Sequence, residues 1–503
     1  MEQQYGVYLF LLAIGLFLYS KFRAANNPRP RLPPGPWQLP VIGSLHHLLR
    51  LRGQTPHRTL RDLSQQYGPL MLLRICERMF VVVSSAEAAR DMFKGNDVAF
   101  EQRPRSPGID SMMEDGLGLF FAPYGERWRL LRRIIMTELL SPRRVESLRS
   151  VREAEAGRLI SSLASLPPGH DLVNIDERID KFVADVSARS IFGGDDLTEQ
   201  DGFQRALKKG LDFSTFFGIR DLFPSWRLLG RMLPRRNEKA VECRRELYRL
   251  MDSLMQRHEE KGDSSDQGII GVLRRIYKEG DMRISLTPGD MRAVMLDVFS
   301  GALDTSSSTL QFAMAELIMN PRVMEKVQLE VRSVIAGDKR LNEVSLREMH
   351  YLKAVVKETF RLHPPAPFNP RECRDDRKIQ GYDIPQGTIA LVNVWAISRD
   401  PKYWEEPDRF VPERFDSENA IDLKGLDFEF LPFGAGRRIC PGISFSQANI
   451  EIALGSLLYH FDWELPEGIK PWEVDMTDVF GLTLRKKSEL LLRPIPVIPL
   501  LQE

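Results

Sequence analysis

The sequence lacks an excess of charge of either sign and has few cysteines, and both features exclude classes of protein. Its 70 lysines and arginines nearly balance 69 acidic residues, so composition gives no argument for nucleic-acid binding. The four cysteines form no CxxC pair and have no regular spacing, which argues against a disulfide framework and a zinc cluster. A reducing compartment fits this usage, and we expect at most one or two of the thiols to do chemistry.

Long apolar runs are absent except at the N-terminus. Gln3 to Ser20 carry no charge and approach the ~17–25 residues that a membrane-spanning helix needs. Glu2 precedes this run while Lys21 and Arg23 follow it, the reverse of the charge order in a cleaved signal peptide. We therefore expect an uncleaved membrane anchor over residues 1–22, with the rest of the chain on the cytosolic side. A signal peptide and an ordinary buried helix are the alternatives.

Prolines then crowd residues 23–37. Because proline fixes φ and favours extended chain, this segment is expected to be a stiff hinge between the anchor and a soluble domain. Internal repeats, long low-complexity stretches and a second linker of this kind are absent from the sequence. Residues 38–503 are therefore predicted to form one large catalytic domain.

Strand-like runs are few, and most of the remaining sequence has helical spacing. The strand candidates are 70–75, 79–83 and 388–392. The clearest helix begins at Thr287 with a proline at the next position and ends before Pro321, a length of roughly 50 Å. Such a helix should be buried in the middle of a mainly α domain with small β-sheets.

Cys440 lies in a glycine-rich loop that precedes a helical segment at 444–459. A thiolate near a helix N-terminus and close to arginines has a lowered pKa, so this sulfur could ligate iron and keep its negative charge. The alternative is a turn whose cysteine is merely buried.

The Cys440 loop resembles the haem-binding loop of the cytochrome P450 family, Phe-x-x-Gly-x-Arg-x-Cys-x-Gly. The matching positions are Phe433, Gly436, Arg438, Cys440 and Gly442. The resemblance implies a haem b cofactor with Cys440 as the thiolate ligand, held between the long central helix and the cysteine loop. Residues 33–37 and 43–47 look most like the plant microsomal (A-type) members.

The resemblance also implies which side chains hold the haem. Trp128 and Arg132 are four residues apart, on one side of a helix where both could reach a propionate, and arginine geometry suits carboxylates. Arg371 and Arg438 are the other implied propionate partners, and Phe433 belongs to the same cofactor-binding set. For each arginine alone, a solvated surface position is the alternative.

The middle of the long helix is poor helix material and resembles the distal, oxygen-binding side of the family. Asp304 and Thr305 match the acid and alcohol that manage protons for the bound oxygen. Gly301 and Ala302 are expected to allow close approach and a local widening of the helix. Ala302 stands where glycine is commoner in the family. A polar face or a helix cap is the alternative interpretation.

Glu358 and Arg361 are three residues apart, which by itself describes an ordinary surface ion pair. In the family, this segment pairs with a later one that contains Arg414. The resemblance implies a buried Glu358–Arg361–Arg414 network, and we expect its loss to impair haem incorporation rather than chemistry.

The implied activity is a monooxygenase reaction in the endoplasmic reticulum membrane, with the catalytic domain in the cytosol. Electrons would come from NADPH through NADPH–cytochrome P450 reductase, and an arginine-rich stretch from Arg127 to Arg144 is either its docking face or merely solvated. The substrate is expected to be a hydrophobic small molecule of plant specialised metabolism. A terpenoid is favoured, and a phenolic, an alkaloid or a fatty-acid derivative is the alternative. Two alternatives are a haem-thiolate isomerase or dehydratase that does not use O₂ and a non-catalytic haem-binding membrane protein.

The candidate pocket walls are five largely apolar segments. They are Ile109–Phe121, Phe213–Phe217, Phe299–Thr305, Ala366–Asn369 and Phe480–Thr483. His363, which precedes two prolines, is predicted to be a packing or turn residue rather than an iron ligand.

Overall fold

The structure, a computed structural model, describes most of the chain between residues 30 and 498. The gaps are 50–54, 106, 113–117, 167–170, 194–201, 204, 208–221, 224, 226–237, 261–267, 280–285, 336–340 and 417–420. The predicted anchor, residues 23–29 of the predicted hinge and the pocket segment Phe213–Phe217 therefore lie outside the described residues. Within the described part, no helix combines the length and apolar character needed to cross a membrane.

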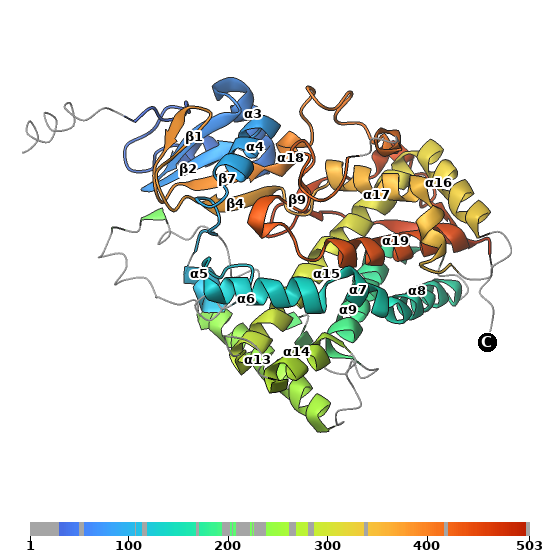
Figure 1. Ribbon diagram of the computed structural model, residues 1–503. Coiled ribbons are helices and arrows are strands. Elements are labelled where there is room, and N and C mark those ends of the chain that lie inside the picture. Colours follow the sequence, from blue (N-terminus) through green and yellow to red (C-terminus); the bar gives the residue numbers. More distant parts are fainter. Residues whose placement is uncertain are drawn as a thin grey trace, which may run out of the picture.

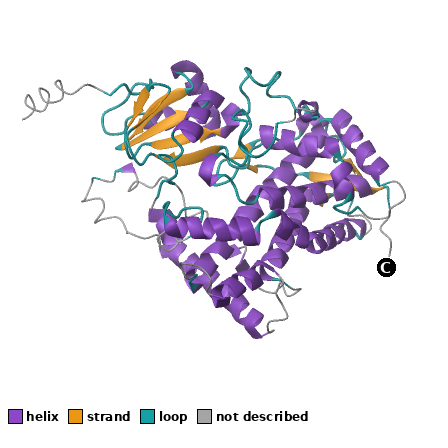
Figure 2. Cartoon of the chain, in the orientation of Figure 1, coloured by secondary structure: helices purple, strands orange, loops and turns teal. Residues whose placement is uncertain are grey.

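Helices dominate the molecule, and most of them gather on one side of it, while the main sheet lies at the other side with α3 and α4 next to it (Figures 1 and 2). The α-helices are α2 (Leu45–Leu49), α3 (Pro56–Tyr67), α4 (Ala86–Arg90), α5 (Pro107–Met112), α6 (Glu126–Ile134), α7 (Pro142–Ser147), α8 (Arg149–Ala164), α9 (Ile175–Phe192), α13 (Glu238–Glu260), α14 (Gly268–Glu279), α15 (Pro288–Met319), α16 (Pro321–Val334), α17 (His350–Leu362), α18 (Val394–Ile397) and α19 (Ile443–His460). The expectation of a mainly α protein with small sheets is confirmed.

The strands form one four-stranded sheet and several smaller ones. They are β1 (Leu70–Ile75), β2 (Arg78–Val83), β3 (Val173–Asn174), β4 (Phe368–Glu372), β5 (Arg377–Ile379), β6 (Tyr382–Ile384), β7 (Ile389–Asn393), β8 (Phe461–Glu464), β9 (Asp478–Val479), β10 (Arg485–Lys486) and β11 (Leu491–Pro496). The main sheet has the order β1-β2-β7-β4, in which β2 and β7 are parallel. All three strand runs expected from the sequence are found in this sheet.

The main sheet is buried on both faces. Along β1, Leu70 and Leu72 belong to one hydrophobic cluster, while Met71 and Leu73 belong to another. This alternation follows from the two-residue period of a strand. A third and larger cluster fills the helical part of the molecule.

Helix α15 runs through the middle of the helical part, where it packs against α9, α17 and α19 (Figure 1). Thr287 caps it: its hydroxyl accepts from the Asp290 N–H, and the Asp290 carboxylate accepts from the Thr287 N–H at 2.7 Å. This is a capping box, with proline in the first turn. The predicted start, end and burial of this helix are confirmed.

The expected widening in the middle of α15 is wrong. The helix is α-helical throughout Gly301–Ser308, because burial among neighbouring helices offsets the low helix propensity of this sequence. The threonine hydroxyls turn back to the helix: Thr305 Oγ1 donates to the Gly301 carbonyl at 2.6 Å, and Thr309 Oγ1 donates to the Thr305 carbonyl at 2.9 Å.

Candidate functional site

The loop before α19 fixes the position of the Cys440 sulfur. Gly434 and Gly436 have φ values of 73° and 68°, a left-handed conformation that glycine adopts without strain. The Cys440 N–H donates to the Phe433 carbonyl at 3.0 Å, and the Gly442 N–H points at the Cys440 Sγ from 3.3 Å. A side chain at Gly434 would place Cβ 2.5 Å from Asn369 Nδ2, so this glycine lets the loop approach β4 closely.

The electrostatics of Cys440 differ from the expectation of a lowered pKa. Burial raises the pKa of the thiol, and the Gly442 N–H, Arg132 and Arg103 oppose this effect without outweighing it. In the polypeptide alone, desolvation of the thiolate therefore exceeds the stabilisation by nearby positive charge. A thiolate at this position needs a further positive partner, which an iron ion provides.

Four arginines surround this region with little compensating negative charge. They are Arg103, Arg132, Arg371 and Arg438, and the pKa of each is lowered, in the first place by burial. Arg371 is 1% exposed, and its Nη2 has no hydrogen-bond partner among the described residues. Arg103 and Arg438 lower its pKa further by repulsion. Buried cations without carboxylate partners are costly, and the two propionates of a haem would neutralise them.

Arg103 was not found by sequence analysis. Its Nη1 donates to Asn369 Oδ1 and to the Pro370 carbonyl, both at 3.1 Å, and burial lowers its pKa to about 9. The guanidinium also stacks on the Phe120 ring, 4.6 Å from its centroid. Because Asn369 and Pro370 are more than 260 residues away along the chain, no local motif marks this residue.

Trp128 and Arg438, both predicted propionate partners, donate to backbone carbonyls in this structure. Trp128 Nε1 donates to the Leu119 carbonyl at 3.1 Å. Arg438 donates to the carbonyls of Leu119 at 3.3 Å, Phe120 at 3.4 Å and Ala122 at 2.6 Å. The Arg438 guanidinium also lies 4.8 Å from the Trp128 ring. Both side chains therefore shape the loop before α6, and their contact with a propionate stays a prediction.

Asp297 holds the same loop from the other side. Its Oδ2 accepts from the Phe120 N–H at 3.4 Å, and burial raises its pKa to about 7. A Cβ at Gly118 would lie 2.6 Å from this oxygen, so the close approach requires glycine. The predicted pocket segment Ile109–Phe121, whose residues 113–117 lie outside the described residues, is thus anchored to α15.

The middle of α15 faces open space. Gly301 is exposed although the helix around it is buried, and a Cβ built on it meets no atom within 4 Å. Asp304 and Thr305 are partly exposed beside it. The Ser306 hydroxyl lies 3.4 Å from that of Ser446 on α19, so this stretch of α15 lies close to the helix that follows the cysteine loop. A thiol, buried cations and open space beside Gly301 together fit a haem.

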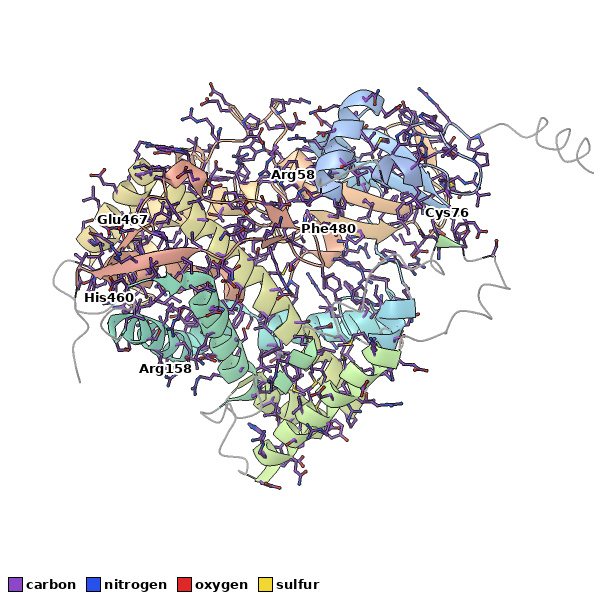
Figure 3. All side chains as sticks on the ribbon, turned by 180° about the vertical axis from the view of Figure 1, so that it is seen from behind. Arg58, Cys76, Arg158, His460, Glu467 and Phe480 are labelled. Carbon is purple, nitrogen blue, oxygen red and sulfur yellow. The ribbon has the colours of Figure 1, made fainter. Side chains whose placement is uncertain are left out.

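Asp304 forms an ion pair that the sequence did not predict. Its Oδ2 accepts a hydrogen bond from Nη2 of Arg485 on β10. Only Leu484 separates the predicted pocket wall Phe480–Thr483 from Arg485. Phe480, labelled in Figure 3, packs edge-on against Phe368 with ring centroids 5.8 Å apart. Phe480 and Leu482 remain about 40% exposed, so this wall presents apolar surface.

Glu358, Arg361 and Arg414 are brought together in the interior. Arg361 donates from Nε and Nη2 to the Glu358 carboxylate at 2.7 and 2.9 Å, and Arg414 Nε lies 3.4 Å from the same group. The side chains of Glu358 and Arg361 are fully buried. Phe360, between them in sequence, packs edge-on against Phe433 with centroids 5.0 Å apart. The network thus braces the start of the cysteine loop.

His363 packs as the sequence suggested. Its ring stacks on Phe312 of α15, with centroids 4.2 Å apart, and its Nε2 lies 2.7 Å from Glu316 Oε1. Burial lowers its pKa, while Glu316 acts in the opposite direction. This histidine joins α17 to α15.

Comparison with known proteins places this site in context. A family model described as cytochrome P450 matches residues 33–493. Desmethyl-deoxy-podophyllotoxin synthase of Sinopodophyllum hexandrum is 43% identical, covering 97% of this chain and 96% of its own. The 5-epiaristolochene 1,3-dihydroxylase of Nicotiana tabacum is 40% identical, covering 98% of both chains. A zebrafish cytochrome P450 solved with progesterone has the same fold, with a TM-score of 0.75 and 23% identity over 88% of this chain and all of its own.

Proposed function

The chain belongs to the cytochrome P450 family, and on this basis we propose that it oxidises a terpenoid-like compound of plant specialised metabolism at the site between Cys440 and α15. The protein is a haem-thiolate monooxygenase that takes electrons from a redox partner and acts on a hydrophobic small molecule. The observation that carries the site assignment is the convergence of a loop cysteine, unpaired buried arginines and the open side of α15.

Haem with a cysteine-ligated iron supplies the reaction itself, because it activates O₂ with two electrons and allows one oxygen atom to enter a C–H or C=C bond. We assign Cys440 as the iron ligand, Phe433 as the ring packed beside it, and Arg371 and Arg132 as propionate partners. Trp128 and Arg438 complete this set by holding the adjoining loop. Neutralising the buried guanidinium groups would stabilise the haem-bound form.

Asp304 and Thr305 are assigned to proton handling on the opposite side. The Thr305 hydroxyl donates to the Gly301 carbonyl, which leaves its oxygen lone pairs available as acceptors. Asp304 places a carboxylate at the preceding position of the helix. An acid and an alcohol so arranged can hold and pass protons without admitting bulk water.

The preference for a terpenoid rests on the pocket and on one relative. The described walls present apolar groups such as Phe120, Phe480 and Leu482, each about 40% exposed, and few charges. Such walls favour a ligand that binds by shape and apolar contact. The tobacco relative is named for a terpene hydrocarbon, whereas the Sinopodophyllum relative is named for a podophyllotoxin precursor, so both classes belong in a substrate panel.

We further propose that NADPH–cytochrome P450 reductase is the redox partner and that residues 1–22 anchor the protein in the endoplasmic reticulum membrane. Arg129, Arg133 and Arg143 are exposed on α6 and α7, and such positive charge would attract an acidic partner. The charge order around the N-terminal apolar run supports a cytosolic catalytic domain.

Full-length protein, co-expressed with a plant reductase and fed a panel of terpenes and podophyllotoxin precursors under ¹⁸O₂, tests the proposal. We expect an NADPH-dependent product that carries one ¹⁸O atom, and a reduced, CO-bound spectrum typical of thiolate ligation that Cys440→Ala abolishes. Normal haem and turnover in Cys440→Ala would refute the ligand assignment. Turnover that needs neither NADPH nor O₂ would support the isomerase alternative.

A further inference from the structure

The carboxylate of Asp304 is held by a residue outside α15. Arg485 donates from Nη2 to Asp304 Oδ2, and the two side chains are 36% and 26% exposed. A charge-assisted bond between arginine and carboxylate has a defined direction. The position of this acid therefore depends on where β10 places its arginine.

Hydrogen bonds from several elements fix the backbone around Arg485. The Leu484 carbonyl accepts from Ser308 Oγ at 2.5 Å, and the Leu484 N–H donates to the Pro365 carbonyl at 2.8 Å. Ser308 and Asp304 are four residues apart on α15, so they share one face of the helix. Leu484 and Arg485 therefore lie along the face of α15 that carries Ser308 and Asp304, with Leu484 beside Ser308 and Arg485 beside Asp304.

The other side of the segment is fixed as well. Lys486 Nζ lies 3.3 Å from Asp176 Oδ2 at the start of α9, and the Lys487 N–H donates to the Thr477 carbonyl at 2.8 Å. Arg485 itself pairs with Val479 of β9. With Leu484 and Lys486 both held, the Arg485 side chain has a fixed origin from which it reaches Asp304.

We propose that Arg485 is a positioning residue for oxygen activation, which holds the Asp304 carboxylate beside Thr305 and so keeps product formation coupled to NADPH consumption. The proposal rests on the proton-handling roles proposed for Asp304 and Thr305. Arg485 does not touch the reacting atoms; it acts through the carboxylate. An acid that leaves its place delivers protons at the wrong point, and reduced oxygen is then released as peroxide instead of entering the substrate.

The connection between β9 and β10 links this acid to the pocket wall. Phe480–Thr483 directly precede Leu484, so a substrate that presses on this wall bears on the segment that carries Arg485. For a substrate that fits this wall poorly, product formed per NADPH should therefore fall more than the binding affinity does.

The test compares Arg485→Gln, Arg485→Lys, Asp304→Asn and the Asp304→Asn/Arg485→Gln double variant in the full-length, haem-containing protein. Lys487→Gln is the matched control, because it removes one positive charge from an exposed position two residues away. The measurements are product per NADPH, peroxide per NADPH and the reduced, CO-bound spectrum, which reports intact haem ligation.

We expect Arg485→Gln to lower product per NADPH by about two- to fivefold, as for residues coupled by direct contact, with peroxide rising and the CO-bound spectrum unchanged. Arg485→Lys should recover part of the loss. The double variant should be no worse than Asp304→Asn alone, and Lys487→Gln should match the wild type. Wild-type coupling in Arg485→Gln, or additive losses in the double variant, would overturn the proposal.

A second measurement does not depend on turnover. Amide hydrogen exchange in the segment 484–487 should increase in Arg485→Gln and in Asp304→Asn to the same extent, and not in Lys487→Gln. Unchanged exchange in the first two variants would show that the ion pair does not hold the segment. A wild-type protein that binds haem but forms no NADPH-dependent product would contradict the proposed function instead, and the exchange result would still decide whether the ion pair between Asp304 and Arg485 links α15 to this segment.

Discussion

Replacing Glu358 by glutamine removes a buried negative charge that two arginines share while leaving the size of the side chain nearly unchanged. Arg361 would keep its bonds to the carbonyls of Ser398, Pro407 and Arg409, at 2.8, 2.7 and 3.0 Å, but its positive charge would stay buried without a counter-charge. Breaking a buried ion pair in this way costs about 3–5 kcal/mol. That is a large part of the ~5–15 kcal/mol that stabilises a typical protein.

The chain contains a matched control for this change. Glu406 and Arg409 have the same three-residue spacing and hydrogen bonds of 2.8 and 2.6 Å, but their side chains are 57% and 68% exposed. An exposed pair contributes about 0–1 kcal/mol. The two glutamine variants therefore differ mainly in burial.

The assay combines thermal unfolding at a fixed scan rate with haem content per polypeptide. With an unfolding entropy of about 2.1 cal mol⁻¹ K⁻¹ per residue, the 503-residue chain loses about 1 °C of Tm per kcal/mol. Glu358→Gln should then lower Tm by about 3–5 °C and reduce the haem-loaded fraction. Glu406→Gln should change Tm by less than about 1 °C. The molecules of Glu358→Gln that do hold haem should keep the wild-type product pattern.

Equal Tm losses in the two variants, or a Glu358→Gln protein with full haem content and normal Tm, would refute this reasoning. An altered product pattern with normal haem content would also contradict it, because it would place Glu358 in the chemistry rather than in the scaffold.

Four further changes test other parts of the site. Thr305→Ala should release peroxide and form less product at an unchanged NADPH oxidation rate, and unaltered coupling would exclude its proton role. Arg371→Gln should lower haem retention, measured by transfer of haem to apomyoglobin. The same change should not destabilise the haem-free chain, because it removes a buried cation that has no carboxylate partner. Haem retention equal to that of the wild type would contradict this. Gly118→Ala should push the loop away from Asp297 and change the ratio of products, measured on one substrate, whereas an unchanged ratio would exclude this clamp. Burial lowers the pKa of His363 from its usual 6.5, so below about pH 6.5 the unfolded chain binds a proton at this residue more readily than the folded chain, and stability falls as pH drops. His363→Asn should therefore show a shallower fall in Tm between pH 6.5 and 5 than the wild type. An equal slope would contradict this.

Local sequence was sufficient wherever a feature depends on neighbouring residues. The cap at Thr287, three of the four strands of the main sheet and the helix after Cys440 were predicted, because capping, alternation and glycine conformation are short-range effects, whereas β4 was not predicted. The widening of α15 was predicted wrongly, since the low helix propensity around Gly301 is outweighed by the packing of the buried residues on either side of this stretch.

Features that join distant segments were missed. Arg485 is 181 residues from Asp304, and nothing in either segment identifies the other as its partner. Arg103 likewise reveals its place only through Asn369 and Pro370 of β4. The directions of Trp128 and Arg438 depend on the path of the loop at 118–122, and that path is set by contacts with Asp297 from another helix.

The parallel pairing of β2 with β7 has a consequence for how the protein is made. The register joins Val83 to Val392, and a ribosome that adds ~5–20 residues per second needs roughly 15–60 s to synthesise the intervening ~300 residues. Throughout that time the nascent chain exposes the unpaired edge of an apolar strand, Phe80–Val83, which is prone to pair with other chains. Chaperone capacity during translation, more than the stability of the finished fold, should therefore limit the yield of this protein in a foreign host.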